Sequence, residues 1–227
     1  MTARSASRRV RILTTVAAVL VIVIGAVVLA AARNDDRGAS APAPGGDRTA
    51  EQAMVVRPDS HRLSDPADAR VTLVEFLDFE CEACRAMYPA MERLRTEYGD
   101  RVSFVVRYFP IPSHFNSGRA ARAAEAAAGQ GRFEQMYQRL FETQAEWGEK
   151  RVAQDAVFRG LAVEIGLDMA AFEAAYNDPA TAARVRSDFD EGLALGVAGT
   201  PSFFINGEKV TVGGSRDLAA ALDAALS

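Results

Sequence analysis

Cys81 and Cys84 are the two cysteines of this 227-residue chain, and two residues separate them. They follow an apolar stretch that predicts a buried strand, and helical periodicity begins directly after them. A thiol at a helix N-terminus is favoured as the thiolate by unpaired backbone N–H groups and by the helix dipole. Because the thiolate is the form that attacks disulfides, the pair is predicted to close and open a disulfide.

Other interpretations of the pair are weaker. Two buried structural thiols would need no such spacing, and a structural disulfide over so short a loop would constrain the unfolded chain little. A zinc site would need further ligands, and the two histidines, His61 and His114, lie in no metal-binding spacing. We therefore predict redox chemistry at Cys81 and Cys84, with no metal and no cofactor.

The first half of the domain is predicted to place the pair at the end of a central strand. A short first strand is expected within residues 55–63, and the buried strand covers residues 71–79. The helix after Cys81 should end near Tyr98, before a third strand over residues 102–109. The net charge of −4 gives no reason to expect nucleic-acid binding.

The second half is predicted to add a block of helices and a hairpin. Residues 118–195 carry helical spacing broken by glycines, without strand signals, and predict four or five helices. A strand is expected at residues 201–205, with a turn at Asn206-Gly207 and a returning strand over 209–212. An amphipathic helix over residues 217–226 closes the chain.

Three polar residues near the pair call for separate interpretation. Glu75 interrupts the apolar strand, and it either faces solvent at the strand end or is buried with a raised pKa and relays protons to Cys84. Strand alternation places Asp78 nearer the surface. His114, in a proline-rich loop, is expected to be solvated rather than part of a groove.

The N-terminal region predicts a membrane anchor. Residues 1–11 form a basic tail expected in the cytoplasm, and the apolar run 12–32 is long enough to cross a bilayer as a helix. Residues 33–54 predict a flexible linker, and 55–227 the folded domain. The alternative is a cleaved signal peptide. Both interpretations export the domain to an oxidising compartment, and the anchor predicts a single-pass protein of the cell membrane.

The order of elements resembles thioredoxin topology with a helical insertion, and the chain resembles the DsbA-like branch of the thioredoxin superfamily. Three matches carry this: residues 79–84 (Phe-Glu-Cys-Glu-Ala-Cys), residues 196–207 (Gly-Val-Ala-Gly-Thr-Pro-Ser-Phe-Phe-Ile-Asn-Gly), and Glu75 six residues before the first cysteine. The resemblance covers residues 55–227. It implies an α/β thioredoxin-like fold whose insertion, about 116–196, lies between the third strand and the cis-proline strand, here preceded by the expected transmembrane helix.

The resemblance also implies roles for five residues. Cys81 is the exposed nucleophile and Cys84 the buried resolving thiol, while Glu75 is the acid beneath the disulfide. Pro201 is the cis-proline packed against the pair, and Thr200 offers backbone groups to an extended substrate segment. The implied partners are exported proteins with cysteine pairs and a membrane quinone-linked redox protein.

One departure leaves the redox direction open. Strongly oxidising members carry Pro-His between the cysteines, whereas this chain carries Glu82-Ala83. A carboxylate beside the thiol disfavours the thiolate, so Cys81 is expected to be acidic but less so than in those members.

The sequence thus predicts an extracytoplasmic thiol–disulfide oxidoreductase acting as oxidant, reductant or isomerase. The alternatives are a non-catalytic binding or chaperone module with a structural disulfide and, more weakly, a thiol pair that carries Cu(I).

Overall fold

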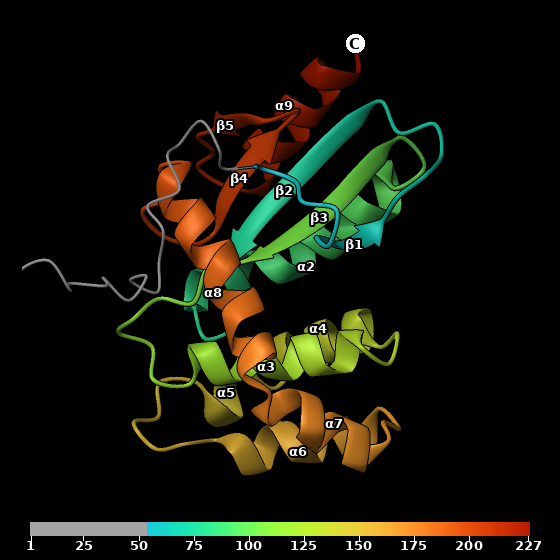
Figure 1. Ribbon diagram of the computed structural model, residues 1–227. Helices are drawn as coiled ribbons and strands as arrows, with labels where there is room; N and C mark the ends of the chain where they lie inside the picture. The colour runs from blue at the N-terminus through green and yellow to red at the C-terminus, as the bar shows by residue number, and fades with distance from the viewer. Residues whose placement is uncertain (1–53) are drawn as a thin grey trace, which may run out of the picture. The chain divides into compact units, whose positions relative to one another are not determined.

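The computed structural model describes residues 54–227 (Figure 1). The expected basic tail (1–11), the expected membrane helix (12–32) and the expected linker up to residue 53 lie outside this range and stay predictions. Within residues 54–227, no helix combines the length and apolar character needed to cross a bilayer.

A five-stranded mixed sheet forms the centre of the domain, in the order β1-β3-β2-β4-β5. The strands are β1 (His61–Ser64), β2 (Val71–Leu77), β3 (Val102–Tyr108), β4 (Ser202–Ile205) and β5 (Glu208–Val210). β2 is parallel to β3 and antiparallel to β4, and β1 is antiparallel to β3. The near-continuous apolar sequence of β2 is explained by this central position, because helices cover both of its faces.

Eight helices surround the sheet in the part of the chain that is described. They are α2 (Glu82–Tyr98), α3 (Ser117–Ala128), α4 (Phe133–Glu142), α5 (Gln144–Trp147), α6 (Asp155–Glu164), α7 (Met169–Asn177), α8 (Pro179–Ala194) and α9 (Ser215–Leu226). The predicted insertion between the third strand and Pro201 is therefore confirmed as helical. It holds six helices rather than four or five, the shortest being the single turn α5. Figure 1 shows α3 to α7 gathered beyond one end of the sheet.

Alternation along β2 decides what lies on each face of the sheet. Val71 and Leu73 pack with apolar residues of α2 and α9. Val74 and Phe76 pack on the opposite face with Phe189 of α8. Successive side chains of a strand point to opposite faces, and Glu75 is two residues after Leu73. The Glu75 side chain therefore lies on the face that α2 covers.

All five predicted strands are shorter than expected, and the first two show why. Residues 54–60 form turns rather than strand. The Ser60 hydroxyl accepts a hydrogen bond from the N–H of Arg57 at 2.9 Å, and the Ser60 N–H donates to the Arg57 carbonyl at 3.1 Å. β2 ends at Leu77 rather than at residue 79. There the Asp78 side chain accepts from the N–H of Glu80 at 2.8 Å, and this local bond replaces strand pairing.

A buried ion pair joins α8 to the sheet. Arg107 of β3 is fully buried, and it donates to Asp188 at 2.7 Å and to Glu191 at 2.6 Å. It also donates to the carbonyls of Met54 and Val55, at 2.7 and 3.0 Å. All the hydrogen-bonding capacity of a buried guanidinium must be met, so this arginine fixes the last insertion helix against the strand.

Candidate active site

The two cysteines lie where β2 gives way to α2. Cys81 is the residue before the first helical turn, with an extended backbone, and Cys84 lies within that turn. Both thiols are free. Cys84 is buried at 1% exposure, as predicted, whereas the expectation that Cys81 is exposed is wrong, because its side chain is 7% exposed. The sequence prediction of a pair at a strand-to-helix junction is therefore confirmed.

The two sulfurs have opposite acidities. The pKa of Cys81 is lowered to about 5, chiefly by a hydrogen bond from the Cys84 thiol and against the effect of burial. Thr200 and the backbone N–H groups of Cys84 and Ala83 lower it further. The pKa of Cys84 is raised well above its ordinary value by burial, by its hydrogen bond to Cys81 and by the charge of Glu75. Cys81 is therefore the thiolate at neutral pH, and Cys84 holds its proton.

Glu75 is buried, at 3% exposure, as one of the two sequence interpretations predicted. Burial raises its pKa to about 8, and the nearby Cys81 charge adds to this effect. Its Oε2 atom has no hydrogen-bond partner among residues 54–227. An acid without a partner in an apolar site is mostly protonated at neutral pH, and it can exchange a proton with a neighbouring thiol.

The loop before β4 completes the thiol site. The Thr200–Pro201 peptide bond is cis, as predicted. The Cys81 sulfur lies 3.3 Å from the Thr200 carbonyl oxygen, to which a protonated thiol donates. This proximity follows from the sheet, because Ser202 pairs with Phe76 on β2. The fold thus brings together all five predicted residues, whose roles stay predictions.

The expectation that Asp78 lies near the surface is wrong. Asp78 is 1% exposed, because the strand ends before it and the following turn folds it inward. Besides the N–H of Glu80, it accepts from the N–H of Ile111 at 2.9 Å and from the Ser117 hydroxyl at 2.6 Å. Strand alternation does not apply to a residue that lies in a turn.

His114 is also not a free loop histidine. Its Nδ1 lies 2.7 Å from Asp78 Oδ2, and its side chain is 22% exposed. The hydrogen bond to Asp78 raises the pKa of His114 to about 9, and the Cys81 charge acts in the same direction. The histidine is therefore a cation at neutral pH, close enough to Cys81 for the two charges to stabilise each other.

Insertion residues hold the backbone around the pair. The Gln144 amide of α5 donates to the carbonyls of Phe79 and Cys81, at 2.6 and 3.0 Å. The buried Glu80 carboxylate accepts from the backbone N–H groups of Asn116 and Glu149, at 2.6 and 3.1 Å. These bonds satisfy buried polar groups of a loop that no strand pairs, so the insertion shapes the thiol site.

Residues 54–227 contain no group of three or more His, Cys, Asp or Glu side chains that could hold a metal ion. The chemistry available to the described site is that of two thiols, a protonated carboxyl group and a histidine cation.

Comparison with known proteins places this geometry in a family. A family model described as Thioredoxin matches residues 64–224. Among solved structures, a thioredoxin-like oxidoreductase from Silicibacter pomeroyi DSS-3 is 29% identical with a TM-score of 0.64, covering 77% of this chain and 96% of that one. Wolbachia pipientis alpha-DsbA1 is 19% identical with a TM-score of 0.66, covering 78% and 95%. Bacillus subtilis BdbD is 20% identical with a TM-score of 0.65, covering 74% and 92%.

Curated relatives share the domain within longer proteins. A Na(+)/H(+) antiporter NhaA from Herminiimonas arsenicoxydans is 36% identical over 169 residues, which are 73% of this chain and 26% of that protein. NhaA 1 of Mycobacterium sp. (strain KMS) is 36% identical over 159 residues, 68% of this chain and 25% of that protein. The chain thus spans about a quarter of the length of these relatives. The family model covers most of the described domain, and this chain belongs to the thioredoxin family with a DsbA-like fold.

Proposed function

We propose that this protein is a thiol–disulfide oxidoreductase that donates its Cys81–Cys84 disulfide to cysteine pairs of other proteins. The observation that carries the proposal is the contrast between an acidic Cys81, whose sulfur lies 3.3 Å from the Thr200 carbonyl, and a proton-holding Cys84 in the first turn of α2. A structural pair would need neither the acidity of the first sulfur nor the buried acid beneath the second.

The direction follows from the acidity of Cys81. A dithiol whose reduced form is stabilised is a stronger oxidant as the disulfide, because closing the bond loses that stabilisation. Here the Cys81 thiolate accepts a hydrogen bond from Cys84, and the His114 cation lies nearby. The pKa of Cys81 is lowered to about 5 with Glu82 in place, so this carboxylate does not prevent the acidity that an oxidant needs.

The exchange proceeds in two displacements. A substrate thiolate attacks the Cys81 sulfur of the disulfide, and the Cys84 sulfur leaves and takes up a proton from Glu75. The second thiolate of the same substrate then attacks the substrate sulfur that is bonded to Cys81. The substrate disulfide forms, and Cys81 leaves as a stable thiolate. Two electrons pass from the substrate dithiol to the enzyme pair, so one substrate disulfide forms for each pair reduced.

The cellular setting that we propose rests on the N-terminal sequence. The anchor over residues 12–32 would hold the domain on the extracytoplasmic face of the cell membrane. There the protein would oxidise exported proteins, and a membrane quinone-linked partner would reoxidise Cys81 and Cys84. A free N-terminus at residue 33 in the soluble fraction of cells would instead support a cleaved signal peptide.

A trapping experiment tests the activity. Oxidised wild-type protein mixed with a reduced dithiol peptide should yield peptide disulfide and reduced enzyme in equal amounts. Cys84→Ser protein, first charged at Cys81 with a small aromatic thiol, should accumulate a mixed disulfide with a peptide that carries one cysteine, because neither Cys84 nor a second peptide thiol can then resolve it. Cys81→Ser should do neither. If peptide oxidation is absent in wild type while peptide binding persists in Cys81→Ser, the protein is the non-catalytic binding module instead.

A further inference from the structure

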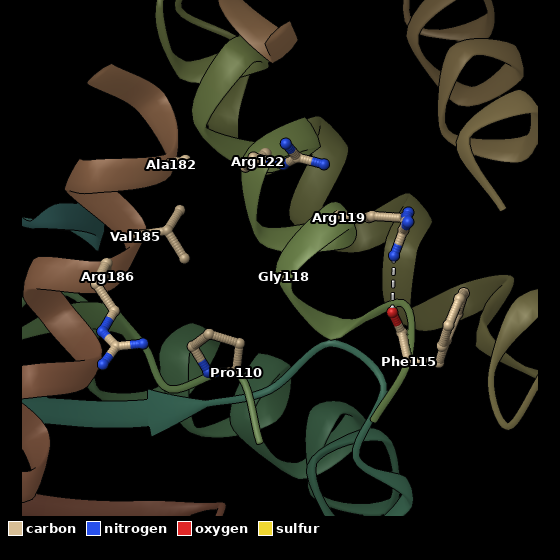
Figure 2. A pocket seen from close by; sticks show the side chains of 8 residues that line it. All are labelled: Pro110, Phe115, Gly118, Arg119, Arg122, Ala182, Val185 and Arg186. Carbon is tan, nitrogen blue, oxygen red and sulfur yellow. Dashed lines mark hydrogen bonds between the residues drawn. The ribbon is translucent and has the colours of Figure 1, made fainter. Parts of the chain in front are cut away.

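A pocket of about 330 Å³ lies between α3 and α8 (Figure 2). Its apolar lining comes from both helices and from the loop after β3: Pro110, Phe115, Ala182 and Val185. Phe115 is 46% exposed, so its ring is accessible to a ligand at the edge of the pocket. None of the five residues assigned to the thiol site lines this pocket.

Three arginines give the pocket a positive charge. Arg119 lies 3.3 Å from Asp155, and Arg186 lies 2.8 Å from Asp190. Arg122 has no carboxylate partner among the residues that the structure describes. Three guanidinium charges are therefore matched by two carboxylates, and the surplus charge belongs to Arg122.

The surroundings of Arg122 leave its charge available. Its guanidinium lies 4.9 Å from the ring centroid of Tyr176, a contact that orients the group without neutralising it. Its neighbour Arg119 is held differently, by a hydrogen bond to the Phe115 carbonyl at 3.0 Å and by stacking over that ring at 4.9 Å. In Figure 2, Arg122 lies on the α3 wall and Arg186 on the facing α8 wall. Such planar donors bind carboxylate and phosphate groups, and a polypeptide segment supplies the carboxylate as Asp or Glu.

The size of the pocket limits its occupant. A volume of about 330 Å³ is near the lower limit for small-molecule sites. It can receive one or two side chains, and the exposed aromatic ring beside arginines is typical of surfaces that bind polypeptides. The apolar lining favours an apolar residue next to the acidic one.

The pocket and the thiol site share one loop. Pro110 and Phe115 line the pocket, while Ile111 and His114, between them in sequence, hydrogen-bond to the buried Asp78. A segment bound in the pocket would therefore contact the same loop that holds the charged groups near Cys81.

We propose that the pocket between α3 and α8 binds an acidic residue flanked by an apolar one, in a segment of the polypeptide whose cysteines react with this protein. The identity of that polypeptide as a redox substrate rests on the proposed function. Binding itself does not, because no thiol takes part in it.

A pair of glycine substitutions tests the location. Gly118 lines the pocket in α3, and a Cβ atom there would meet no other atom within 4 Å, so Gly118→Leu should fill the pocket without disturbing the helix. Gly160 is an exposed helical glycine of α6 with equally open surroundings, and it is outside the pocket. Gly160→Leu is therefore the matched control.

A second pair tests the charge. Arg122→Gln removes the surplus charge, and Arg216→Gln removes an exposed arginine of α9 that has no ion-pair partner among residues 54–227. The probe is a fluorescent, cysteine-free hexapeptide with a Glu-Leu-Glu centre, compared with its Gln-Leu-Gln counterpart. Anisotropy is measured at low ionic strength and again at about 0.3 M salt.

The Glu peptide should bind wild type. Its affinity should fall about threefold or more after Arg122→Gln or Gly118→Leu, since one partly exposed charge pair contributes that much. Both control variants should bind as wild type does, and the Gln peptide should bind weakly throughout. Equal binding of both peptides, or no effect of Arg122→Gln and Gly118→Leu, would overturn the proposal. So would binding of inorganic phosphate alone, with no peptide binding.

Failure of the redox function is detected separately. Cys81→Ser protein has no reactive nucleophile, yet it should bind the Glu peptide as wild type does. If it binds and the wild type fails to oxidise any dithiol peptide, the pocket stands and the proposed function falls.

Discussion

Replacing Glu75 by Gln should change the pH dependence of stability in the direction opposite to that expected for an ion-paired acid. The pKa of this carboxyl is raised from its ordinary 4.5 to about 8, because the folded protein buries it next to the Cys81 sulfur. Between these two pH values the folded protein therefore holds a proton that the unfolded chain has released. Stability must fall as pH rises through this window, and Glu75→Gln should abolish that part of the fall.

The size of the effect follows from the same shift. A displacement of the pKa from 4.5 to about 8 corresponds to about 5 kcal/mol at 1.36 kcal/mol per unit, and side-chain relaxation or water entry would reduce this toward about 3 kcal/mol. The amide introduced by Glu75→Gln would keep the shape of the protonated acid. The variant should thus match wild type near pH 5 and exceed it by several kcal/mol near pH 8.5.

Urea denaturation of the reduced proteins at several pH values, in a phosphine reductant, measures this difference. Taking the difference between two proteins cancels the titration of His114, whereas the titrations of Cys81 and Cys84 cancel only in part, because both thiols interact with Glu75. Glu208→Gln, at an exposed position of β5, is the control and should differ from wild type by a constant amount. If the gap between wild type and Glu75→Gln stays constant from pH 5 to pH 8.5, the carboxyl is not held protonated by burial.

Three further substitutions probe the bonds around the site. His114→Asn should raise the pKa of Cys81 by less than about one unit, as measured by thiolate absorbance. An unchanged Cys81 titration would mean that the His114 charge does not act on the thiolate. His114→Asn should also remove stability that is complete below pH 6.5 and lost as pH rises through about 9, as calorimetry across that range can test. Gln144→Met leaves two buried carbonyls unpaired and should cost about 2 kcal/mol in urea, while a neutral result would mean that water replaces the amide. Asp188→Asn leaves the buried charge of Arg107 under-compensated and should cost about 3 kcal/mol; a loss within error would show that Arg107 relies on Glu191.

The sequence alone was sufficient to predict those site residues that a pattern of neighbouring residues identifies. Cys81 and Cys84 mark their own chemistry by spacing, and Glu75 is conspicuous as one charge in an apolar strand. Pro201 could be assigned because the motif around it resembles a family, and its cis bond is confirmed. Each of these depends on a few neighbours along the chain.

The residues that sequence reasoning missed depend on distant contacts. His114 is a cation because it contacts Asp78, which lies 36 positions earlier in the chain. No local sequence pattern predicts that contact. Gln144 reaches the Cys81 carbonyl across 63 positions. The one available signal was two acids, Asp78 and Glu80, directly before a cysteine pair. Buried acids require partners, and the proline-rich loop was the nearest source of them.

The wide separation of the contacts around Cys81 has a consequence for when its sulfur becomes reactive. Cys81 leaves the ribosome long before Thr200, which lies 119 positions further along the chain. Until the last strands pair with β2, the sulfur lacks its neighbour from the cis-proline loop. A nascent chain that has formed the first turn of α2 should therefore carry the part of the Cys81 acidity that comes from Cys84 and the nearby backbone, and the part that comes from Thr200 should arise in one of the last steps of folding. In chains arrested before residue 196 the pKa of Cys81 should therefore be higher than in completed chains, as alkylation rates over a range of pH can measure.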